Sequence, residues 1–291
     1  MTEHGLKTNL PEMTGIYPGI PMEQYLAHDA VSNSDLGNMA RSPEYAHLCK
    51  TEPGEKTDTP ATLLGTAIHT AILEPERFET EYTLDPTDED GGYRAGWRNT
   101  KAYKAAKADI RAHGHEVLAQ RDLDACRWIQ DNVAASWIGR EILAIKDDVE
   151  VSVLASDPEY DLVRKIRPDV VVSAASMLVD IKKTRDIRPG PFSRDCVTFG
   201  YHRTAPWYLD TANLAWDDAP FKHYLFLVIA DTAPHEIRGY TLPGEAIEHG
   251  RQQYATLLDR WAKCATEGKW PGGSGEIEEL ALPPYVYTQE I

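Results

Sequence analysis

Three carboxylates and a lysine are spaced along this sequence in a way that suits chemistry on a phosphate ester. Asp180 and Lys182 are separated only by Ile181. Asp169 precedes Asp180 by 11 residues, and Glu150 precedes Asp169 by 19 residues. Because side chains alternate between the two faces of a strand, Asp180 and Lys182 share one face and Ile181 points to the other. Adjacent strands would bring all four charged side chains together.

Such a set of side chains favours a site for a divalent cation. Carboxylates held close together in a partly buried site repel one another, and a bound cation removes that repulsion. Mg²⁺ takes oxygen ligands, commonly one or two carboxylates together with phosphate oxygens, and such a site activates water and neutralises charge on the scissile phosphate. Lys182 has three roles open to it: orienting the attacking water, stabilising charge at phosphorus, or acting as a base with a lowered pKa.

The local patterns predict strands that carry this set. Residues 149–155 alternate as a strand does, residues 162–173 are rich in β-branched residues and pair with them as a hairpin, and residues 177–182 form a third strand. Further strands are expected over 224–230 and 235–241. Helices are expected within 32–50, from 59 to before Pro75, in two pieces over 97–137, over 203–215 with Pro206 in the first turn, and over 244–267. We expect Ser34 to cap the first helix and Ser42 to cap the second.

This order of elements predicts an α/β (α+β) fold, with a central mixed β-sheet flanked by helices and an N-terminal helical region folded over it. We expect residues 1–20 to be an irregular lead-in and residues 21–291 to form a single domain. Within it, the helical part would cover about 32–137 and the catalytic core about 147–267.

Composition limits the functional classes. The net charge of −16 is unfavourable for a protein that wraps nucleic acid with its whole surface, although it allows a local basic groove. The four cysteines are widely spaced and form no CxxC pair, so neither a zinc ribbon nor an iron–sulfur cluster is indicated. No apolar run approaches the length of a membrane span, and the first residues lack the apolar core of a secretory signal. We therefore expect a cytoplasmic protein.

Two groups of basic residues are candidates for DNA contacts. Lys101, Lys104, Lys107 and Arg111 share one helix face, which is either an ordinary solvated surface or a surface that follows phosphates. The basic residues near the carboxylates are better candidates, because a positioned Arg binds phosphate bidentately; they are Arg164, Lys165, Arg167, Arg185, Arg188, Arg194 and Arg203. Tyr93, Trp97, Trp207 and Tyr208 are candidates for base stacking, although Trp207 better fits the core.

Five segments together resemble the PD-(D/E)XK nuclease superfamily, and within it the RecE-type (exonuclease VIII-like) branch common in phages and prophages. They are SNSDLGNMARSPEYAHL at 32–48, GTAIHTAILEPERF at 65–78, VEVSVLASDPEYDLVRKIRPDVVV at 149–172, LVDIKKT at 178–184 and FGYHRTAPWYLD at 199–210. The order and the spacing of these segments both agree with the family. The resemblance implies a restriction-endonuclease-like core.

The resemblance also implies roles for individual residues. Asp169 and Asp180 would bind Mg²⁺, with Mn²⁺ as a substitute, and the carbonyl of Ile181 would complete the coordination. Glu150 would help to hold a metal or its water, and Lys182 would be the catalytic lysine. His69 would be the additional ligand or near-site histidine of RecB-like and RecE-like members. Taken alone, a histidine beside an apolar helical stripe is more commonly a core residue.

One departure from the family pattern concerns the helix after the Asp-x-Lys strand. That helix usually reads Y-x-x-Q-x-x-x-Y, and here Tyr201 and Tyr208 are present while Thr204 stands at the Gln position. The Gln usually positions phosphate or the active-site lysine, and Thr is shorter by two atoms. Arg203 or His202 is a candidate to take over this contact, so Arg203, Thr204 and Tyr208 join Arg167, Arg185, Lys101 and Lys104 as expected DNA contacts.

The function implied by the resemblance is a 5′→3′ exonuclease that acts on the ends of linear double-stranded DNA and generates single strands for recombination. The family also implies a homotetrameric ring around the DNA, a single-strand annealing protein as partner, and a bacterial host cytoplasm. Two alternatives stay open: a nuclease of other polarity or with endonuclease activity, and a catalytically silent DNA- or protein-binding module of the same fold. Thr204 favours the silent module, whereas the intact carboxylates and Lys182 oppose it.

Overall fold

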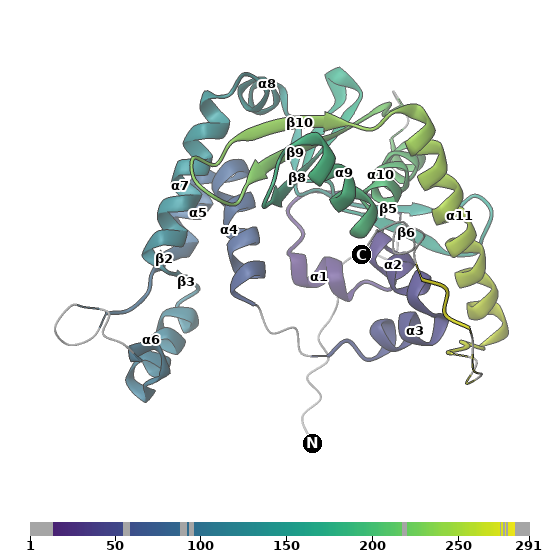
Figure 1. The fold of residues 1–291 in the computed structure, drawn as a ribbon, viewed down its shortest axis with the longest axis horizontal. Coiled ribbons are helices and arrows are strands. Elements are labelled where there is room, and N and C mark those ends of the chain that lie inside the picture. The colour runs from purple at the N-terminus through teal and green to yellow at the C-terminus, as the bar shows by residue number, and fades with distance from the viewer. Residues whose placement is uncertain are drawn as a thin grey trace, which may run out of the picture.

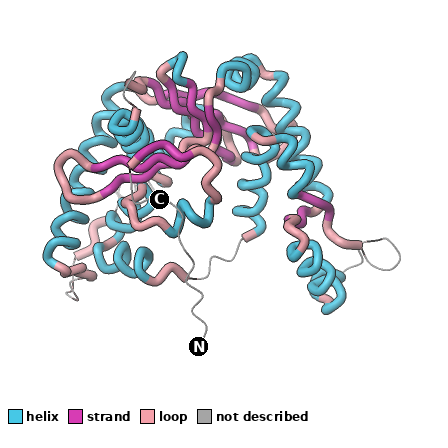
Figure 2. The backbone as a smooth tube through the Cα atoms, turned by 180° about the vertical axis from the view of Figure 1, so that it is seen from behind, coloured by secondary structure: helices cyan, strands magenta, loops and turns pink. Residues whose placement is uncertain are grey.

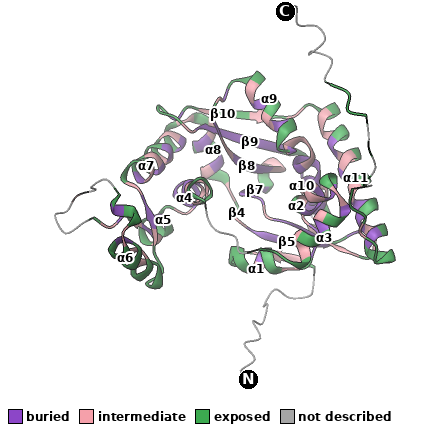
Figure 3. Ribbon diagram, turned by 60° about the horizontal axis from the view of Figure 1, so that its bottom comes forward, coloured by how far each residue is buried: buried purple, intermediate pink, exposed green. Residues whose placement is uncertain are grey.

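The computed structural model describes residues 14–54, 59–87, 92, 96–216, 220–273, 275, 277 and 279–282. At its centre lies a mixed five-stranded sheet with the order β10-β9-β8-β7-β4. Its first three strands are labelled in Figure 1, and all five are labelled in Figure 3. The strands are β4 (Asp148–Val149), β7 (Val170–Val172), β8 (Met177–Thr184), β9 (His223–Ala230) and β10 (Ile237–Thr241). β8 and β9 run parallel, and the other neighbours run antiparallel. The predicted fold class is confirmed.

Helices cover both faces of this sheet, which explains the unbroken apolar run of β9. Phe226 points into a core on one face, shared with α10 and α11, and the next residue, Leu227, points into a second core shared with α4 and α7. A strand that is buried on both faces needs apolar residues at successive positions, and β8 and β9 are accordingly buried in Figure 3. The covering helices are α4 (Pro60–Leu73), α7 (Gln120–Ala135), α10 (Tyr201–Ala215) and α11 (Gly244–Glu267).

Two of the predicted strands are broken next to the carboxylates that they carry. The stretch 149–155 forms the end of β4 and then β5 (Ser152–Ser156), and these belong to different sheets. The stretch 162–173 forms β6 (Val163–Ile166) and then β7. The single continuous strands predicted here are therefore wrong. The chain turns at Glu150, whose φ of 50° is uncommon for a residue with a side chain.

A second sheet holds β5 and β6 together with a strand from the start of the described chain (Figure 2). β1 (Gly15–Tyr17) pairs antiparallel with β5, whereas we had predicted an irregular lead-in over 1–20. Residues 1–13 of that lead-in lie outside the described residues. β1 is followed by the short helix α1 (Met22–Ala27).

The predicted N-terminal helices are present as α2 (Asn33–Arg41) and α3 (Pro43–Thr51). Ser32 caps α2 in place of the predicted Ser34, because the side chains of Ser32 and Asp35 each accept a hydrogen bond from the other's backbone N–H. Ser42 caps α3, as predicted. In α10, Pro206 lies beyond the first turn in which we expected it, because the helix already begins at Tyr201.

The remaining elements lie around this framework. α5 (Pro75–Glu81), β2 (Tyr82–Leu84), α6 (Lys101–Ala112) and β3 (Glu116–Leu118) form an arm in which β2 and β3 pair in parallel, with α6 at its far end (Figure 1). The others are η1 (Trp97–Asn99), α8 (Trp137–Ile145), η2 (Ser173–Ala175) and α9 (Pro189–Thr198). Across the described part of the chain, no helix combines the length and the apolar character that crossing a membrane requires.

Candidate active site

The breaks in the two strands place Glu150 and Asp169 side by side. The backbone N–H of Glu150 donates a hydrogen bond of 3.1 Å to the carbonyl of Asp169. Asp169 directly precedes β7, and its Oδ2 accepts a hydrogen bond of 2.6 Å from the backbone N–H of Ile181 in β8. The turned backbone at Glu150 therefore stands at the edge where β4, β7 and β8 meet. Unusual backbone angles of this kind cluster at functional sites.

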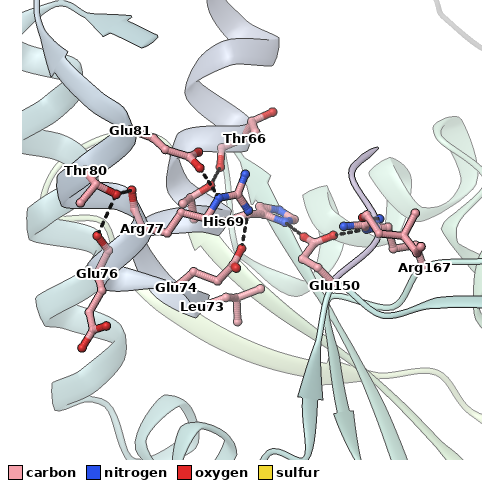
Figure 4. Close-up of polar contacts among 12 residues, drawn as sticks. Thr66, His69, Leu73, Glu74, Glu76, Arg77, Thr80, Glu81, Glu150 and Arg167 are labelled. Atoms are coloured by element: carbon pink, nitrogen blue, oxygen red, sulfur yellow. Dashed lines mark hydrogen bonds and ion pairs between the residues drawn. The ribbon is translucent and has the colours of Figure 1, made fainter. Parts of the chain in front are cut away.

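His69 reaches the same two carboxylates from the helix that covers the sheet. Ile68 and Ile72 of α4 are buried against the sheet, and this leaves His69 at the border of the buried stripe. Its Nδ1 lies 3.5 Å from Oδ1 of Asp169 and 3.6 Å from Oε1 of Glu150. Figure 4 shows the ring directed toward Glu150. Its position beside two carboxylates agrees with the expected near-site histidine.

Arg167 fixes the opposite side of Glu150. Its Nε donates to Oε2 of Glu150 at 2.9 Å, and Figure 4 shows Glu150 between Arg167 and His69. Arg167 Nη1 also donates to the carbonyl of Ile20 at 2.7 Å and to Oγ of Ser152 at 3.0 Å. The Arg167 side chain is only 10% exposed. Its guanidinium is thus engaged inside the protein and is not free for the DNA contact that we expected.

Asp180 and Lys182 lie beside this cluster and are paired with each other. Lys182 Nζ donates to Oδ1 of Asp180 at 2.6 Å, as expected for two residues on one face of β8. The other carboxylate oxygen of Asp180, Oδ2, is buried and has no hydrogen-bond partner within the described chain. Lys182 Nζ also lies 5.1 Å from the centre of the Tyr201 ring at the start of α10.

Comparison with known proteins agrees with this geometry. The profile of the family described as a PDDEXK-like domain of unknown function (DUF3799) matches residues 32–283. The chain belongs to this family. PD-(D/E)XK membership, expected from the sequence, is therefore confirmed, and the family and fold support a nuclease.

A matching solved structure shares this fold. A protein from Eubacterium rectale, provisionally named an exonuclease, matches with a TM-score of 0.60 at 11% identity, over 94% of this chain and 99% of its own. LHK-Exo, solved in complex with dAMP, matches with a TM-score of 0.30 at 11% identity, over 84% of this chain and 95% of its own. The first likeness supports the fold of this PDDEXK-like domain. A search of the curated proteins gave no match.

PD-(D/E)XK nucleases use divalent metals, and two observations indicate that the site fits one. His69, Glu150 and Asp169 each offer one ligand atom, and these three atoms lie within 4.8 Å of one another. The Oδ2 of Asp180 is buried and accepts no hydrogen bond of ordinary geometry within the described chain, although the Tyr224 hydroxyl lies close to this carboxylate. A buried oxygen of this kind is one that a cation would satisfy. A nitrogen with carboxylate oxygens is also a common ligand set for divalent metals.

Burial and neighbouring charges raise the pKa values of His69 and Asp180 and lower that of Asp169. Burial lowers the pKa of His69, but the carboxylates of Asp169 and Glu150 outweigh burial and raise it to about 10. Burial raises the pKa of Asp169, yet His69, Lys182 and the N–H of Ile181 lower it below the ordinary value. Burial raises the pKa of Asp180 to about 6 despite its pairing with Lys182. A buried carboxylate that is under-stabilised in this way has room for a further positive charge.

The pKa of Lys182 is also shifted by its neighbours. Burial lowers it, but Asp180 and Asp169 outweigh burial, and the net effect is a pKa above the ordinary lysine value. The ammonium form is therefore stable near neutral pH. The three roles that the sequence left open for Lys182 stay open, because a cation bound by Asp180 and Asp169 would offset the charges that raise this pKa.

The other residues expected to contact DNA differ in exposure and in distance from the carboxylates. Arg185 is exposed near the end of β8, and Arg203 is half-buried in α10. Thr204 is buried, accepts a hydrogen bond of 2.9 Å from Asn33 Nδ2 and donates one to the carbonyl of Gly200. Lys101 and Lys104 are exposed on α6, at the far end of the arm and away from the carboxylates (Figure 1).

Three of the four aromatic candidates lie within the described residues. Tyr208 packs against Tyr224 below the site, with their rings edge to face and 5.9 Å apart, and Trp207 is completely buried, as expected. Trp97 is buried as well, so it is not available for stacking on a base, and Tyr93 lies outside the described residues. The sequence reasoning missed Asn33 and the role of Arg167 as a partner of Glu150. Nothing in the sequence pairs Asn33 with Thr204, because 171 residues separate them.

Proposed function

We propose that this chain is a Mg²⁺-dependent exonuclease that degrades linear double-stranded DNA from its ends in the 5′→3′ direction. The observation that carries the proposal is the convergence of His69, Glu150 and Asp169 next to the Asp180–Lys182 pair. A nitrogen and several carboxylate oxygens around one point, with an ammonium group beside them, is an arrangement suited to hydrolysing a phosphodiester. Mn²⁺ would substitute for Mg²⁺.

The residues divide the work as follows. His69, Glu150, Asp169 and Asp180 would hold the cation, which activates water and neutralises phosphate charge when it is bound. The carbonyl of Ile181 would contribute as well: the N–H of Ile181 points to Asp169, and the N–H and C=O of one strand residue point to the same side. Lys182, as an ammonium ion, stabilises the negative charge that builds up on the phosphate oxygens.

The charges around the site are consistent with an enzyme that contacts DNA only near its active site. With a net charge of −16, a general attraction to DNA is absent, so the phosphates need specific contacts, for which Arg185 and Arg203 are available. A homotetrameric ring would gather such contacts in a channel. We extend the proposal to a ring of this kind, to a single-strand annealing partner that receives the product strand, and to work in a bacterial cytoplasm.

The deciding experiment is digestion of linear duplex DNA labelled at its 5′ or 3′ ends, beside a closed circular plasmid. With Mg²⁺ we expect loss of the 5′ label as mononucleotides, an intact circle, and no digestion with EDTA. A folded Lys182→Met variant is the control for contaminating nucleases. Early release of the 3′ label would contradict the polarity, and cutting of the circle would identify an endonuclease. If the folded protein binds DNA but leaves it intact, the chain is a silent binding module.

A further inference from the structure

A cavity of about 600 Å³ lies at the start of α10 and has no role in the cluster described above. It is formed by α2, the turn between α9 and α10, the start of α10, and α11. Its lining residues include Gly37, Val197, Phe199, Arg203, His249 and Gln253. Its size falls within the range of about 300–1,000 Å³ that is typical of small-molecule sites.

Two large apolar side chains of this cavity face the solvent. Val197 is 69% exposed and Phe199 is 60% exposed, at the end of α9 and directly after it. The Phe199 ring lies 5.6 Å from the Tyr201 ring, and the Tyr201 ring lies 5.1 Å from Nζ of Lys182. One aromatic ring therefore separates the exposed face of Phe199 from the catalytic lysine. An exposed ring so close to a nuclease site is suited to stacking on a base.

Arg203 supplies a cation in the same cavity. Its guanidinium lies against two glycines, since a Cβ built on Gly37 or Gly200 would meet Nη2 at 3.2 Å or 2.9 Å. Its Nε has a long hydrogen bond of 3.4 Å to Oδ1 of Asn33. No carboxylate among the described residues is paired with Arg203, in contrast to Arg164, Arg167 and Arg251. Burial lowers the pKa of Arg203, and an anion at the guanidinium would offset this cost.

We propose that the cavity binds an unpaired nucleotide of the DNA strand that enters the active site, with the base stacked on Phe199 and a phosphate on Arg203. Charge complementarity favours this occupant: in a chain with a net charge of −16, the cavity offers a guanidinium without a carboxylate beside an apolar ring. The inference rests on the proposed function and adds a specific requirement to it. The strand must be unpaired at this point, because a base within a duplex cannot stack on a side chain.

Fluorescence of 2-aminopurine tests the stacking without any cleavage. The probes are short thymidine oligonucleotides that each carry one 2-aminopurine, at successive positions, mixed with the full chain in the presence of EDTA. We expect the protein to quench the probe at one or two positions. Phe199→Leu, which keeps apolar volume but removes the ring, should abolish this quenching and weaken binding about five- to a hundred-fold. Arg203→Gln should weaken binding about ten- to a hundred-fold.

The matched control is Trp137→Leu, since Trp137 is an aromatic residue that is 71% exposed on α8 and lies outside the cavity. It should bind and quench as the parent chain does. The proposal is wrong if no position is quenched, or if Phe199→Leu quenches as well as the parent. It is also wrong if Phe199→Leu changes the oligomeric state and leaves the fluorescence unchanged, because the cavity would then join two copies of the chain. Failure of DNA digestion alone would contradict the proposed function and not this inference.

Discussion

The carboxylates around His69 favour its protonated form, so a metal ion bound at His69 would displace a proton. In the structure its ring faces Asp169 and Glu150, and these carboxylates outweigh burial and raise its pKa to about 10, from an ordinary value of 6.5. Because the folded-state pKa is the higher one, the charged ring contributes stability below about pH 6.5, and this contribution is lost as the pH rises through about 10. A histidine that ligates a metal is neutral, so binding and proton release are linked.

We therefore expect the affinity for Mn²⁺ to rise with pH, by roughly tenfold per unit between about pH 7 and pH 9, with one proton released per ion. Calorimetric titrations in two buffers with different ionisation enthalpies measure the protons released. His69→Ala should remove this proton release and lower nuclease activity while the protein stays folded. If His69→Ala instead melts many degrees lower and binds Mn²⁺ with the same pH dependence as the parent, His69 is only a structural residue.

Alanine substitutions of Asp180 and of Lys182 should differ in their effect on metal affinity, although the two side chains are hydrogen-bonded to each other. Each change to alanine should lower the cleavage rate by about a hundred- to a thousand-fold. Only Asp180→Ala should weaken Mn²⁺ binding, because Asp180 carries the buried oxygen that has no hydrogen bond within the described chain. Calorimetric titrations with Mn²⁺ compare the two variants, and Lys183→Ala, at the next position of β8, is the control. Equal losses of metal affinity at Asp180 and Lys182 would contradict these roles.

The strands and helices around the site were predictable to different degrees. β8 and β9 were predicted nearly to their ends, because alternating and continuous apolar patterns are strong signals of strands. The break at Glu150 had no local signal, since neither glycine nor a turn sequence marks its positive φ. The break before Asp169 did have one, because Pro168 cannot donate a backbone hydrogen bond to a neighbouring strand. The spacing of the carboxylates therefore predicted the candidate site, while the partner of Glu150, Arg167, required the three-dimensional structure.

Helix α10 carries the departure from the family pattern, and its packing changes what Thr204→Gln should do. Thr204 is buried and already hydrogen-bonded to Asn33 and to the carbonyl of Gly200. A longer side chain would have to displace Asn33, and overpacking of this kind typically costs about 1–3 kcal/mol. We expect Thr204→Gln to lower the urea midpoint without raising the cleavage rate, and Asn33→Ala in the same chain to recover part of the stability. A stable single variant that cuts faster would indicate that Thr204 is the weak point of the site.

The basic residues around the site fall into two classes, those paired inside the protein and those exposed to solvent. Arg164 and Arg167 are hydrogen-bonded to carboxylates in the interior, while Arg185 is exposed near the site. Arg167 additionally binds the carbonyl of Ile20, just after β1, which pairs with β5. The first described residues therefore support the candidate metal ligand Glu150 from outside the central sheet.

Truncation tests this long-range support. Removing residues 1–20 deletes β1 and the Ile20 carbonyl that accepts from Arg167, so we expect a loss of stability of about 1–3 kcal/mol, as for a buried hydrogen bond to a charged group. The orientation of Glu150 depends on Arg167, so Mn²⁺ affinity should fall as well. Removing only residues 1–13 keeps every contact described here and is the matched control. Urea unfolding and Mn²⁺ calorimetry are the measurements, and a chain without residues 1–20 that matches the control in both would restore the irregular lead-in that the sequence predicted.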